Sequence, residues 1–558
     1  MRAGLVYGSY AVGIAAIAAL MEWQTNTPRY LEFGHDVDLR PAEYGVVLAL
    51  FTILTVAFVV LVKGKPPPLA QFDDRAAAPP SLSLAGCAVF AFLASLVVAR
   101  LVLDAFPNSG DEYAYLVQSM EYLHGRLWAD QPPLGDFFQQ FQLRIVNGKW
   151  VSMYPPGWPA VLALGEGLGL PAYAVDPLIA AATAVVFYFL ARRYVTAGTA
   201  LLAVGSLILS AFFIFNEASF FSHAAIALAG IATALAGHRF LERPSVAPGL
   251  AAGLSLGFVV VTRPDSAVLL SIPLAAQIAA SWSWRRYLCS TWIVLGALPG
   301  VILLLAYFHA VTGNALLPVP NWSAPGQERL MLPADLPENL TLKLLIWRIW
   351  LLMIWTSPLL VIATPIAFLQ CCWKRKLDFT DFYAVVTIAF FVFYPGTGGN
   401  QYGPRYYYMA FPFMILTIAK AVDPLLADRN SGWQRVCLHL IAAHWTAQTV
   451  ILPFRAVHEH RVVVQRQDMY REVERTGIAN AVVLVASSTA PLRPMRPADL
   501  ARNGTTLDRP VIYALDLKGR IDELRALLPD RSFFRYERKR GWVAGSLQEL
   551  PAPPKAGL

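Results

Sequence analysis

Charged residues are scarce in this chain. Asp, Glu, Lys and Arg make up 15% of its 558 residues and hydrophobic residues make up 56%, whereas a soluble domain has about 25% charged residues. The hydrophobic residues occur in runs of about twenty, the length that a helix needs to cross a hydrocarbon core. The clearest runs are 4–22, 43–62, 83–103, 290–308 and 433–453. Because backbone groups in lipid must pair within their own segment, we expect an α-helical, multi-pass membrane protein.

Several chemical signatures are absent. The five cysteines lie in or beside hydrophobic runs and lack the spacing of zinc ligands or of a disulfide framework. There is no glycine-rich loop of the type that binds nucleotides. The net charge of +8 is not clustered into a basic face, so no nucleic-acid partner is expected. No internal repeat is visible, which disfavours an inverted-repeat transporter.

Basic loops mark the cytoplasmic side of a membrane protein, and assigning them to that side predicts about thirteen transmembrane helices. The chain would lie in the plasma (inner) membrane, with a loop at 104–156 and everything after about residue 455 on the periplasmic or extracellular face. Residues 157–193 are expected to make one net crossing, with a shallow piece at 157–169 and a full helix at 172–191.

Composition predicts three segments. They are two N-terminal transmembrane helices at 1–82, a transmembrane catalytic core with its outer loop at 83–455, and a small soluble α/β domain at 456–558. The elements expected in the last segment are strands at 481–486, 511–515 and 533–538, and an amphipathic helix at 519–528.

The most informative feature is the pair Asp111-Glu112 at the start of the outer loop. Apolar residues at spacings of three and four follow it, which predicts an amphipathic helix along the membrane surface. Ser109 and Glu112 fit a capping box at its start. Acids in a first helical turn are common because they complement the helix dipole, so a purely structural role stays open for both. The other interpretation makes Asp111 a general base that faces a substrate, while Glu112 caps the helix.

Four further residues are candidates for substrate binding. Tyr154 lies in a proline-rich return to the membrane, where it would be a wall of the site or an interface aromatic. Glu217 and His223 lie at a predicted outer helix–helix turn and would join the same pocket or remain solvated. Arg263 interrupts an apolar region, where an arginine usually has a partner. That partner would be Asp265 or a lipid-linked phosphate.

The segment 396–408 combines four glycines with Arg405 and four tyrosines. Glycines let backbone approach a ligand closely. Membrane topology does not favour positive charge on the outer side, so Arg405 needs another explanation there. A guanidinium can bind phosphate through two parallel hydrogen bonds, so Arg405 is predicted to bind phosphate. Tyr402 and its neighbours would line a sugar site or anchor the helix at the interface.

Three Asn-x-Ser/Thr triplets, at Asn321, Asn339 and Asn503, fall in predicted outer regions. Such triplets are acceptors for glycosylation where the host modifies them.

Over residues 83–425 the chain resembles the GT-C superfamily of membrane glycosyltransferases, in particular the branch of protein O-mannosyltransferases and lipid A aminoarabinose transferases. The resemblance consists of a membrane helix that leads into Asp111-Glu112, a Pro-Pro return to the membrane at 155–156, a Thr-Arg-Pro-Asp turn at 262–265 and a Gly-Pro-Arg-Tyr entry to a late helix at 403–406.

This resemblance implies an inverting transfer of a sugar from a polyprenyl-phosphate donor to an acceptor hydroxyl at the outer membrane face. It assigns the general base to Asp111, with Glu112 second, and suggests Arg405 and Arg263 for the lipid phosphate. The acceptor would be a protein, a lipid or a glycan. No cofactor is expected; a divalent cation is compatible with the reaction, but the sequence offers no ligand cluster for one. The alternatives are a lipid-linked sugar transporter or flippase, and a non-catalytic envelope assembly protein.

Overall fold

The computed structural model describes residues 2–25, 41–62, 81–140, 142–281, 283–319, 340–393, 401–428, 432–486, 500–517, 519–538 and 545–551. The predicted sequons at Asn321 and Asn339 lie outside the described residues, as do residues 394–400 of the glycine-rich segment. The chain forms two compact units. Unit 1 comprises 1–101, 173–304 and 331–457, and unit 2 comprises 102–172, 305–330 and 458–558. This grouping differs from the three predicted segments because it joins the outer loop to the C-terminal hundred residues.

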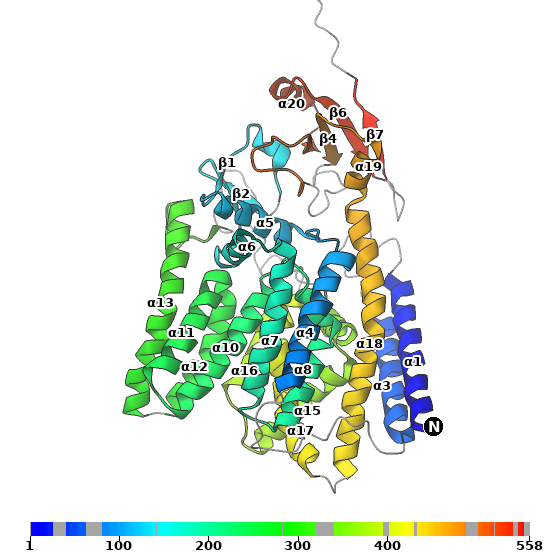
Figure 1. The fold of residues 1–558 in the computed structure, drawn as a ribbon, viewed down its shortest axis with the longest axis vertical. Coiled ribbons are helices and arrows are strands. Elements are labelled where there is room, and N and C mark those ends of the chain that lie inside the picture. Colours follow the sequence, from blue (N-terminus) through cyan, green and yellow to red (C-terminus); the bar gives the residue numbers. More distant parts are fainter. Residues whose placement is uncertain are drawn as a thin grey trace, which may run out of the picture. The chain divides into compact units, whose positions relative to one another are not determined.

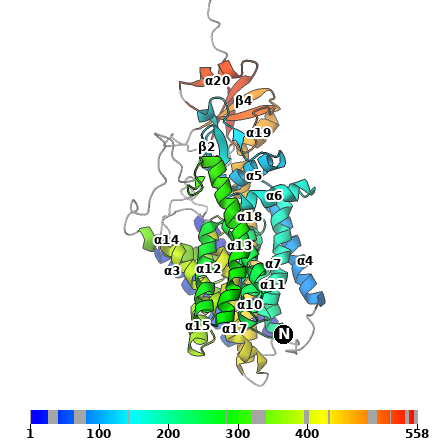
Figure 2. The ribbon, with the colours of Figure 1, turned by 90° about the vertical axis from the view of Figure 1, so that its left-hand side faces the viewer.

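Unit 1 is a bundle of helices (Figures 1 and 2). Its helices are α1 (Arg2–Thr25), α3 (Pro41–Leu61), α4 (Ser81–Val97), α7 (Val175–Ala191), α8 (Ala197–Ile208), α9 (Ala211–Asn216), α10 (His223–Glu242), α11 (Val246–Thr262), α12 (Pro264–Ala280), α14 (Leu340–Trp355), α15 (Pro358–Trp373), α16 (Phe379–Phe393), the 3-10 turn η6 (Arg405–Ala410) and α17 (Phe411–Ala427). Four elements have residues in both units: the π-helical turn η1 (Val98–Val102), η3 (Ala172–Ala174), α13 (Trp284–Thr312) and α18 (Gly432–Arg466).

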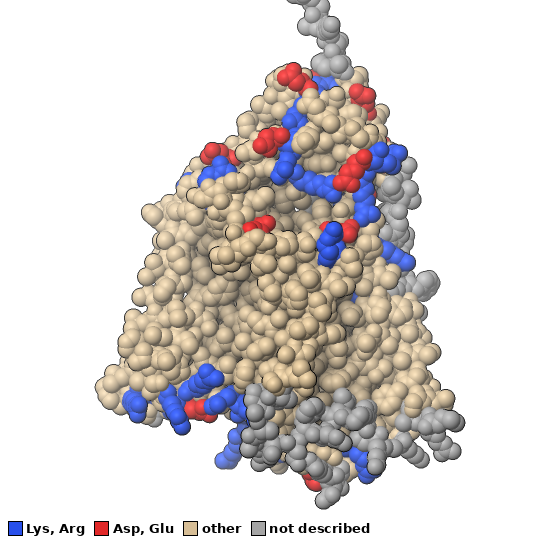
Figure 3. All heavy atoms as spheres, in the orientation of Figure 1, with Lys and Arg blue, Asp and Glu red and all other residues tan. Residues whose placement is uncertain are grey.

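These helices make the protein a multi-pass membrane protein. Within the described residues, six helices are long and apolar enough to cross a membrane, and the bent pair α14–α15 would provide a seventh. Further apolar helices of 10–17 residues accompany them, so the expected total of about thirteen spans stays a prediction. On the face shown in Figure 3, Lys and Arg gather along the lower margin, next to a broad surface with few charges.

Helices α11 and α13 approach each other through glycines. A Cβ atom on Gly253 would lie 2.2 Å from the carbonyl oxygen of Ile293, and one on Gly300 would lie 2.0 Å from that of Gly257. No larger residue fits at such distances. Small residues at four-residue spacing let helix backbones pack closely where lipid supplies no hydrophobic driving force, so this pattern fixes the α11–α13 contact.

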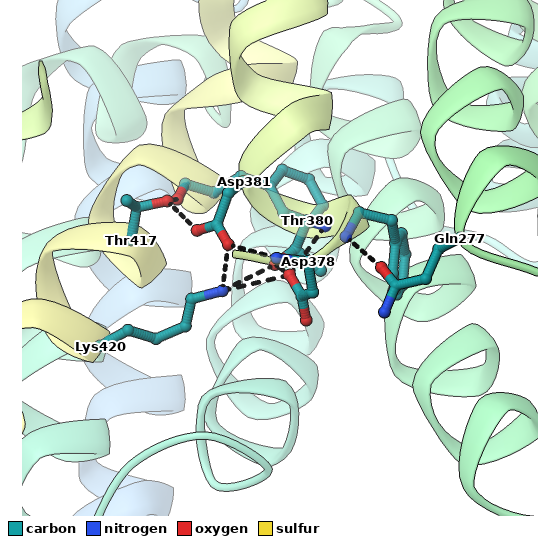
Figure 4. A network of polar contacts seen from close by, with 8 residues as sticks. Gln277, Asp378, Thr380, Asp381, Thr417 and Lys420 are labelled. Atoms are coloured by element: carbon teal, nitrogen blue, oxygen red, sulfur yellow. Dashed lines mark hydrogen bonds and ion pairs between the residues drawn. The ribbon is translucent and has the colours of Figure 1, made fainter. Parts of the chain in front are cut away.

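A buried polar network joins α16 to α17 (Figure 4). Lys420 on α17 lies 2.5 Å from Asp381 Oδ2 and 3.1 Å from Asp378 Oδ1, and Thr417 donates a hydrogen bond of 2.6 Å to the other oxygen of Asp381. The ammonium group also lies over the ring of Tyr194, 4.6 Å from its centroid. A buried charge is tolerated only when it is paired, and here each charge has an opposite charge and hydroxyl partners, so the network ties the two helices together.

Unit 2 contains two small sheets. Its elements are α5 (Gly110–Leu123), β1 (Ala129–Asp130), η2 (Gly135–Phe138), β2 (Leu143–Val146), β3 (Lys149–Ser152), α6 (Gly157–Gly167), α19 (Asp468–Thr476), β4 (Ala481–Ala486), β5 (Val511–Asp516), α20 (Ile521–Leu527), β6 (Ser532–Glu537) and β7 (Ser546–Glu549). The loop forms the antiparallel sheet β1-β3-β2, and the C-terminal region forms the sheet β5-β4-β6-β7. Strands β5, β4 and β6 are parallel and β7 is antiparallel to β6.

The C-terminal prediction is largely confirmed. Strand β4 has the predicted bounds, while β5, β6 and α20 begin or end within two residues of theirs. Strand β7 and the loop sheet were not predicted, because their strands of two to four residues are too short to show a clear alternation. The short predicted piece at 157–169 forms the separate 11-residue helix α6.

Both faces of the C-terminal sheet are covered by residues of the outer loop. On one face Val483 and Val485 pack with Tyr113 and Val117 of α5 and with α19. The other face packs Val482 and Leu484 against residues 137–138 of η2 and against α20. Alternate residues of a strand point to opposite faces, so the continuous apolar run of β4 fills both cores. The loop and the sheet therefore form one hydrophobic unit.

Asn503 closes the edge of strand β5. Its side-chain nitrogen donates to the carbonyl oxygen of Tyr513 (2.7 Å) and its side-chain oxygen accepts from the N–H of Tyr513 (2.8 Å). The residue is only 4% exposed. Its side-chain amide therefore takes the place of a neighbouring strand. Although Asn503 belongs to an Asn-x-Thr triplet, its side chain is buried and is not available on the surface as a glycosylation acceptor.

Candidate functional site

The capping box at the start of α5 is confirmed. The Ser109 hydroxyl accepts a hydrogen bond from the N–H of Glu112 (3.1 Å). In return, Oε2 of Glu112 accepts from the N–H of Asn108 (2.9 Å) and from the Ser109 hydroxyl (3.1 Å). Glu112 is fully buried. Its carboxylate thus serves the start of the helix, where backbone groups lack partners within the helix. These contacts account for a structural role, and the catalytic role of Glu112 stays a prediction.

Asp111 is half-buried and bonds to Tyr154. The Tyr154 hydroxyl donates to Oδ1 of Asp111 at 2.5 Å, and the rings of Tyr154 and Tyr115 lie 4.7 Å apart. The contact exists because the N–H of Ser152, at the end of β3, donates to the side-chain oxygen of Gln118 on α5 (3.0 Å). The strand thereby carries Tyr154 back to the first turn of α5. Tyr154, predicted to be a wall of the site or an interface aromatic, therefore contacts Asp111 within unit 2.

The amphipathic helix predicted after Asp111-Glu112 is α5. Tyr113 is buried on it, whereas Leu123 and Leu127 are 44% and 45% exposed. The helix ends at Leu123, and the chain then turns at Gly125 with a positive φ, so Leu127 no longer belongs to the helical face. Glycine suits that left-handed conformation.

In unit 1, two predicted arginines converge on one tyrosine. The guanidinium carbon of Arg263 lies 5.5 Å from the ring centroid of Tyr406, and that of Arg405 lies 6.0 Å from the same centroid. Arg405 also lies over the ring of Phe221 at 4.0 Å. We call these four residues together with His223 the arginine cluster. Arg405 is only 7% exposed, so its positive charge is largely removed from water.

His223 belongs to the same cluster. A guanidinium nitrogen of Arg263 lies 3.2 Å from Nε2 of His223, and the imidazole ring lies 5.8 Å from that of Phe221. Because the guanidinium can only donate, the imidazole nitrogen that meets it must accept and therefore carries no proton. Arg263 also pairs with Asp265 at 3.5 Å. The predicted local pair is therefore present, and it coexists with the convergence on Tyr406.

Glu217 is buried, so the predicted alternative of a solvated turn is wrong. Glu217 is 0% exposed and His223 is 2% exposed. The hydroxyl of Tyr408 donates to Oε1 of Glu217 at 2.6 Å, while Oε2 has no hydrogen-bond partner within the described part of the chain. Burial raises the pKa of Glu217 to about 8, although the hydrogen bond from Tyr408 lowers it. The carboxyl group is accordingly neutral over most of the physiological range.

Tyr402 is held by Asn216, the residue that precedes Glu217 and was not predicted to have a role. The side-chain nitrogen of Asn216 donates to the carbonyl oxygen of Tyr402 (3.1 Å) and to that of Phe212 (2.8 Å). The ring of Tyr402 packs 6.0 Å from that of Phe221. Tyr402 therefore borders the arginine cluster through its ring and through the chain that leads to Arg405.

Arg348 on α14 is a further buried arginine that was not predicted. It is 1% exposed and donates to the carbonyl oxygen of Phe391, whose ring stacks on Tyr406 at 5.0 Å. An arginine inside an apolar run was the available signal, but nothing in the sequence showed which element it meets. Arg348 therefore holds Phe391, which packs against Tyr406 of the arginine cluster.

The structure thus brings the predicted residues together in two places. Arg263, Arg405, His223, Tyr402 and Glu217 lie around η6 in unit 1, and Asp111, Glu112 and Tyr154 lie at the start of α5 in unit 2. Among the described residues, no group of three or more His, Cys, Asp or Glu is arranged to hold a metal ion.

No family model matches the chain, and no curated protein matches it. Among solved structures it is similar to ArnT from Cupriavidus metallidurans in the apo state, with 14% identity and a TM-score of 0.49 over 80% of this chain and 88% of that chain. The same protein bound to undecaprenyl phosphate gives 13% identity and a TM-score of 0.48 over 81% and 93%. The Archaeoglobus fulgidus oligosaccharyltransferase in the apo form gives 11% identity and a TM-score of 0.42 over 81% and 69%.

Proposed function

We propose that this protein transfers a sugar from a polyprenyl-phosphate donor to an acceptor hydroxyl, with inversion at the anomeric carbon. The observation that carries the proposal is the convergence of Arg263 and Arg405 on Tyr406 inside a bundle of apolar helices. A lipid that carries a phosphate matches both features, since its isoprenoid chain fits among apolar helices and its phosphate fits the two guanidinium groups.

The aromatic rings restrict how the arginines present their donors. A guanidinium that lies over an aromatic ring keeps its N–H groups directed outward around the edge of its plane. Phe221 and Tyr406 thus pre-orient Arg405. In a site that excludes water, such preorganised donors lower the barrier for departure of a phosphate by a few kcal/mol.

Asp111 supplies the base in this proposal. The acceptor oxygen attacks the anomeric carbon, its proton passes to the carboxylate of Asp111, and the bond between the anomeric carbon and the phosphate oxygen breaks. The lipid phosphate leaves with the bonding electrons. A hydroxyl is far less acidic than a carboxylic acid, so proton transfer accompanies the attack rather than preceding it. The hydrogen bond from Tyr154 to Oδ1 orients this carboxylate.

The membrane face is part of the proposal. Positive-inside bias favours an outer position for loop 104–156, which makes the periplasmic or extracellular face of the inner membrane the place of transfer. Identifying the glycosylated products will show whether the acceptor is a protein, a lipid or a glycan.

The test compares glycolipids and glycans, by mass spectrometry, from cells that express the wild type, Asp111→Asn or no protein. We expect one glycosylated product that requires the wild type and disappears with Asp111→Asn. Glu112→Gln is the matched control, because it changes the neighbouring carboxylate and keeps an acceptor for the cap. A product that persists at the wild-type level in Asp111→Asn overturns the assignment of the base. If the protein moves a lipid-linked sugar across the membrane of liposomes that contain no acceptor, the proposed function would change from transferase to flippase.

A further inference from the structure

We infer that Asn216 and Glu217 are positioning residues that hold the turn around Arg405 from both sides. The inference rests on the proposed function, since it takes the phosphate as the ligand of Arg405. It changes the predicted role of Glu217, which here acts by positioning Arg405 instead of binding the sugar donor itself. It also assigns a role to Asn216.

Asn216 and Glu217 form hydrogen bonds with the chain at two points, one on each side of Arg405. Asn216 donates to the carbonyl oxygen of Tyr402, three residues before the arginine. Glu217 accepts from the hydroxyl of Tyr408, three residues after it. Both side chains are fully buried. Two adjacent residues at the end of α9 therefore fix the start and the end of one short segment.

This segment needs to be held because its backbone is unusual. Tyr402 has a φ of 58° and Gly403 has a φ of 90°. Residues other than glycine rarely adopt the left-handed region, and they keep it only when the surroundings fix them. The hydrogen bond from Asn216 is made at Tyr402 itself. Without it, this residue would relax toward ordinary backbone angles and carry Arg405 with it.

The packing of Gly403 leaves little room for other arrangements. A Cβ atom there would lie 2.8 Å from Cδ2 of Phe212 and 3.0 Å from Cγ of Trp355. Asn216 also bonds to the carbonyl oxygen of Phe212. The asparagine thus joins the turn to the helix that packs against it, so that Arg405 is placed by α9 as well as by its own segment.

The role of Glu217 fits a neutral carboxyl group. A neutral carboxyl group can keep the hydrogen bond to Tyr408 without leaving an uncompensated negative charge in a buried place. The buried position of Glu217 favours the neutral form.

The experiment measures binding of undecaprenyl phosphate to the full-length protein in detergent by native mass spectrometry, with undecaprenol as the uncharged probe. Asn216→Ala and Glu217→Ala are expected to weaken binding of undecaprenyl phosphate about fivefold, in line with the loss of one buried hydrogen bond. Binding of undecaprenol should not change. Glu217→Gln keeps an acceptor for Tyr408 and should bind undecaprenyl phosphate like the wild type.

Two variants keep the test decisive if a substitution harms folding. Tyr408→Phe removes only the hydroxyl that bonds to Glu217 and should reproduce the effect of Glu217→Ala. Thr196→Ala removes the N-cap of α8 (Ala197–Ile208), where the threonine bonds to Asp423 at 2.7 Å, and serves as a control that lowers stability without touching the turn. If Asn216→Ala, Glu217→Ala and Tyr408→Phe all bind undecaprenyl phosphate as Thr196→Ala does, the inference is overturned.

A double-mutant cycle separates this inference from the proposed function. In an Arg405→Gln background, Asn216→Ala should cause no further loss of binding, because it acts only through the arginine. Additive losses would show that Asn216 acts elsewhere and would overturn the inference alone. If Arg405→Gln binds undecaprenyl phosphate as tightly as the wild type, the phosphate role in the proposed function fails, whatever the positioning variants do.

Discussion

The hydroxyl of Tyr154 donates to Oδ1 of Asp111 at 2.5 Å, across 43 residues of sequence. This bond joins the first turn of a helix to the end of a strand within the same loop. It fixes the position of the Asp111 carboxylate relative to the end of the strand. The pair is therefore the part of unit 2 whose chemistry can be tested most directly.

Tyr154→Phe should lower kcat about tenfold to a hundredfold, because hydrogen bonds to charged groups contribute about 1.5–3 kcal/mol. The measurement is the rate of product formation with saturating donor. Tyr115→Phe, which changes the stacked neighbour and leaves Asp111 its donor, is the control. Equal rates for Tyr154→Phe and the wild type would contradict a role for this bond in catalysis.

Glu112→Ala should destabilise the protein and Ser109→Ala should do so by about 1 kcal/mol, the usual effect of losing an N-cap. Both effects would appear as lower midpoints of thermal unfolding in detergent. Glu112→Gln keeps an acceptor for the helix start and should retain most activity. Loss of activity in Glu112→Gln with an unchanged midpoint would restore Glu112 as a catalytic residue.

Glu217 should make stability depend on pH. Its pKa of about 8 lies above the ordinary value near 4.3 that we expect in the unfolded chain. Between these values the folded protein binds more protons than the unfolded chain, so the free energy of unfolding falls as the pH rises from about 5 to about 8 and then levels off. We expect the unfolding midpoint of the wild type to decrease over this range more than that of Glu217→Gln. Parallel pH profiles would contradict the raised pKa.

Gly403→Ala should be strongly destabilising. The new methyl group would meet Phe212 and Trp355 at 2.8–3.0 Å, and the φ of 90° adds roughly 1–2 kcal/mol of backbone strain. A drop in the unfolding midpoint together with weaker binding of undecaprenyl phosphate is expected. Gly313→Ala is a matched control, since Gly313 also has a positive φ but nothing within 4 Å of its Cβ position.

Asn503 should carry no glycan even in a host that modifies such triplets, because its side-chain amide is bonded to the edge of β5. Peptide mass spectrometry after expression in such a host tests this. Asn503→Ala should lower stability by about 1–3 kcal/mol, since it leaves a buried N–H and carbonyl of Tyr513 without their partner. Thr505→Ala removes the triplet without the hydrogen bonds and should leave stability unchanged. Full occupancy of Asn503 by a glycan would contradict the structure.

Hydrophobic periodicity and capping residues correctly predicted the helices and strands that are long or that begin with a clear capping residue. The apolar runs became helices, Ser109 became an N-cap, and the run at 481–486 became β4 with its predicted bounds. These features depend on neighbours within a few residues, so the sequence contains the information directly. The same reasoning could not separate Glu112 from Asp111 until the bonds around Asn108 and Ser109 were seen.

Long-range placement was the part that sequence patterns could not supply. Arg263 and Arg405 were each singled out by their cost in an apolar setting, but their shared contact with Tyr406 depends on how α12 and η6 pack. For Glu217 a solvated position stayed open beside a place in the pocket, because a turn between helices is usually exposed. It is buried, and the hydroxyl of Tyr408 in η6 donates to it. The pairing of Asn216 with Tyr402 across 186 residues had no sequence signal.

The two-sided packing of the C-terminal sheet has a consequence for biosynthesis. The loop that carries Asp111 is made early, but the strands that complete its cores, β4 to β7, emerge from the ribosome more than three hundred residues later. Until then Tyr113 and residues 137–138 have no β4 to cover them. A nascent chain inserted in the membrane therefore lacks the finished hydrophobic cores around α5 and η2 until β4 has been made.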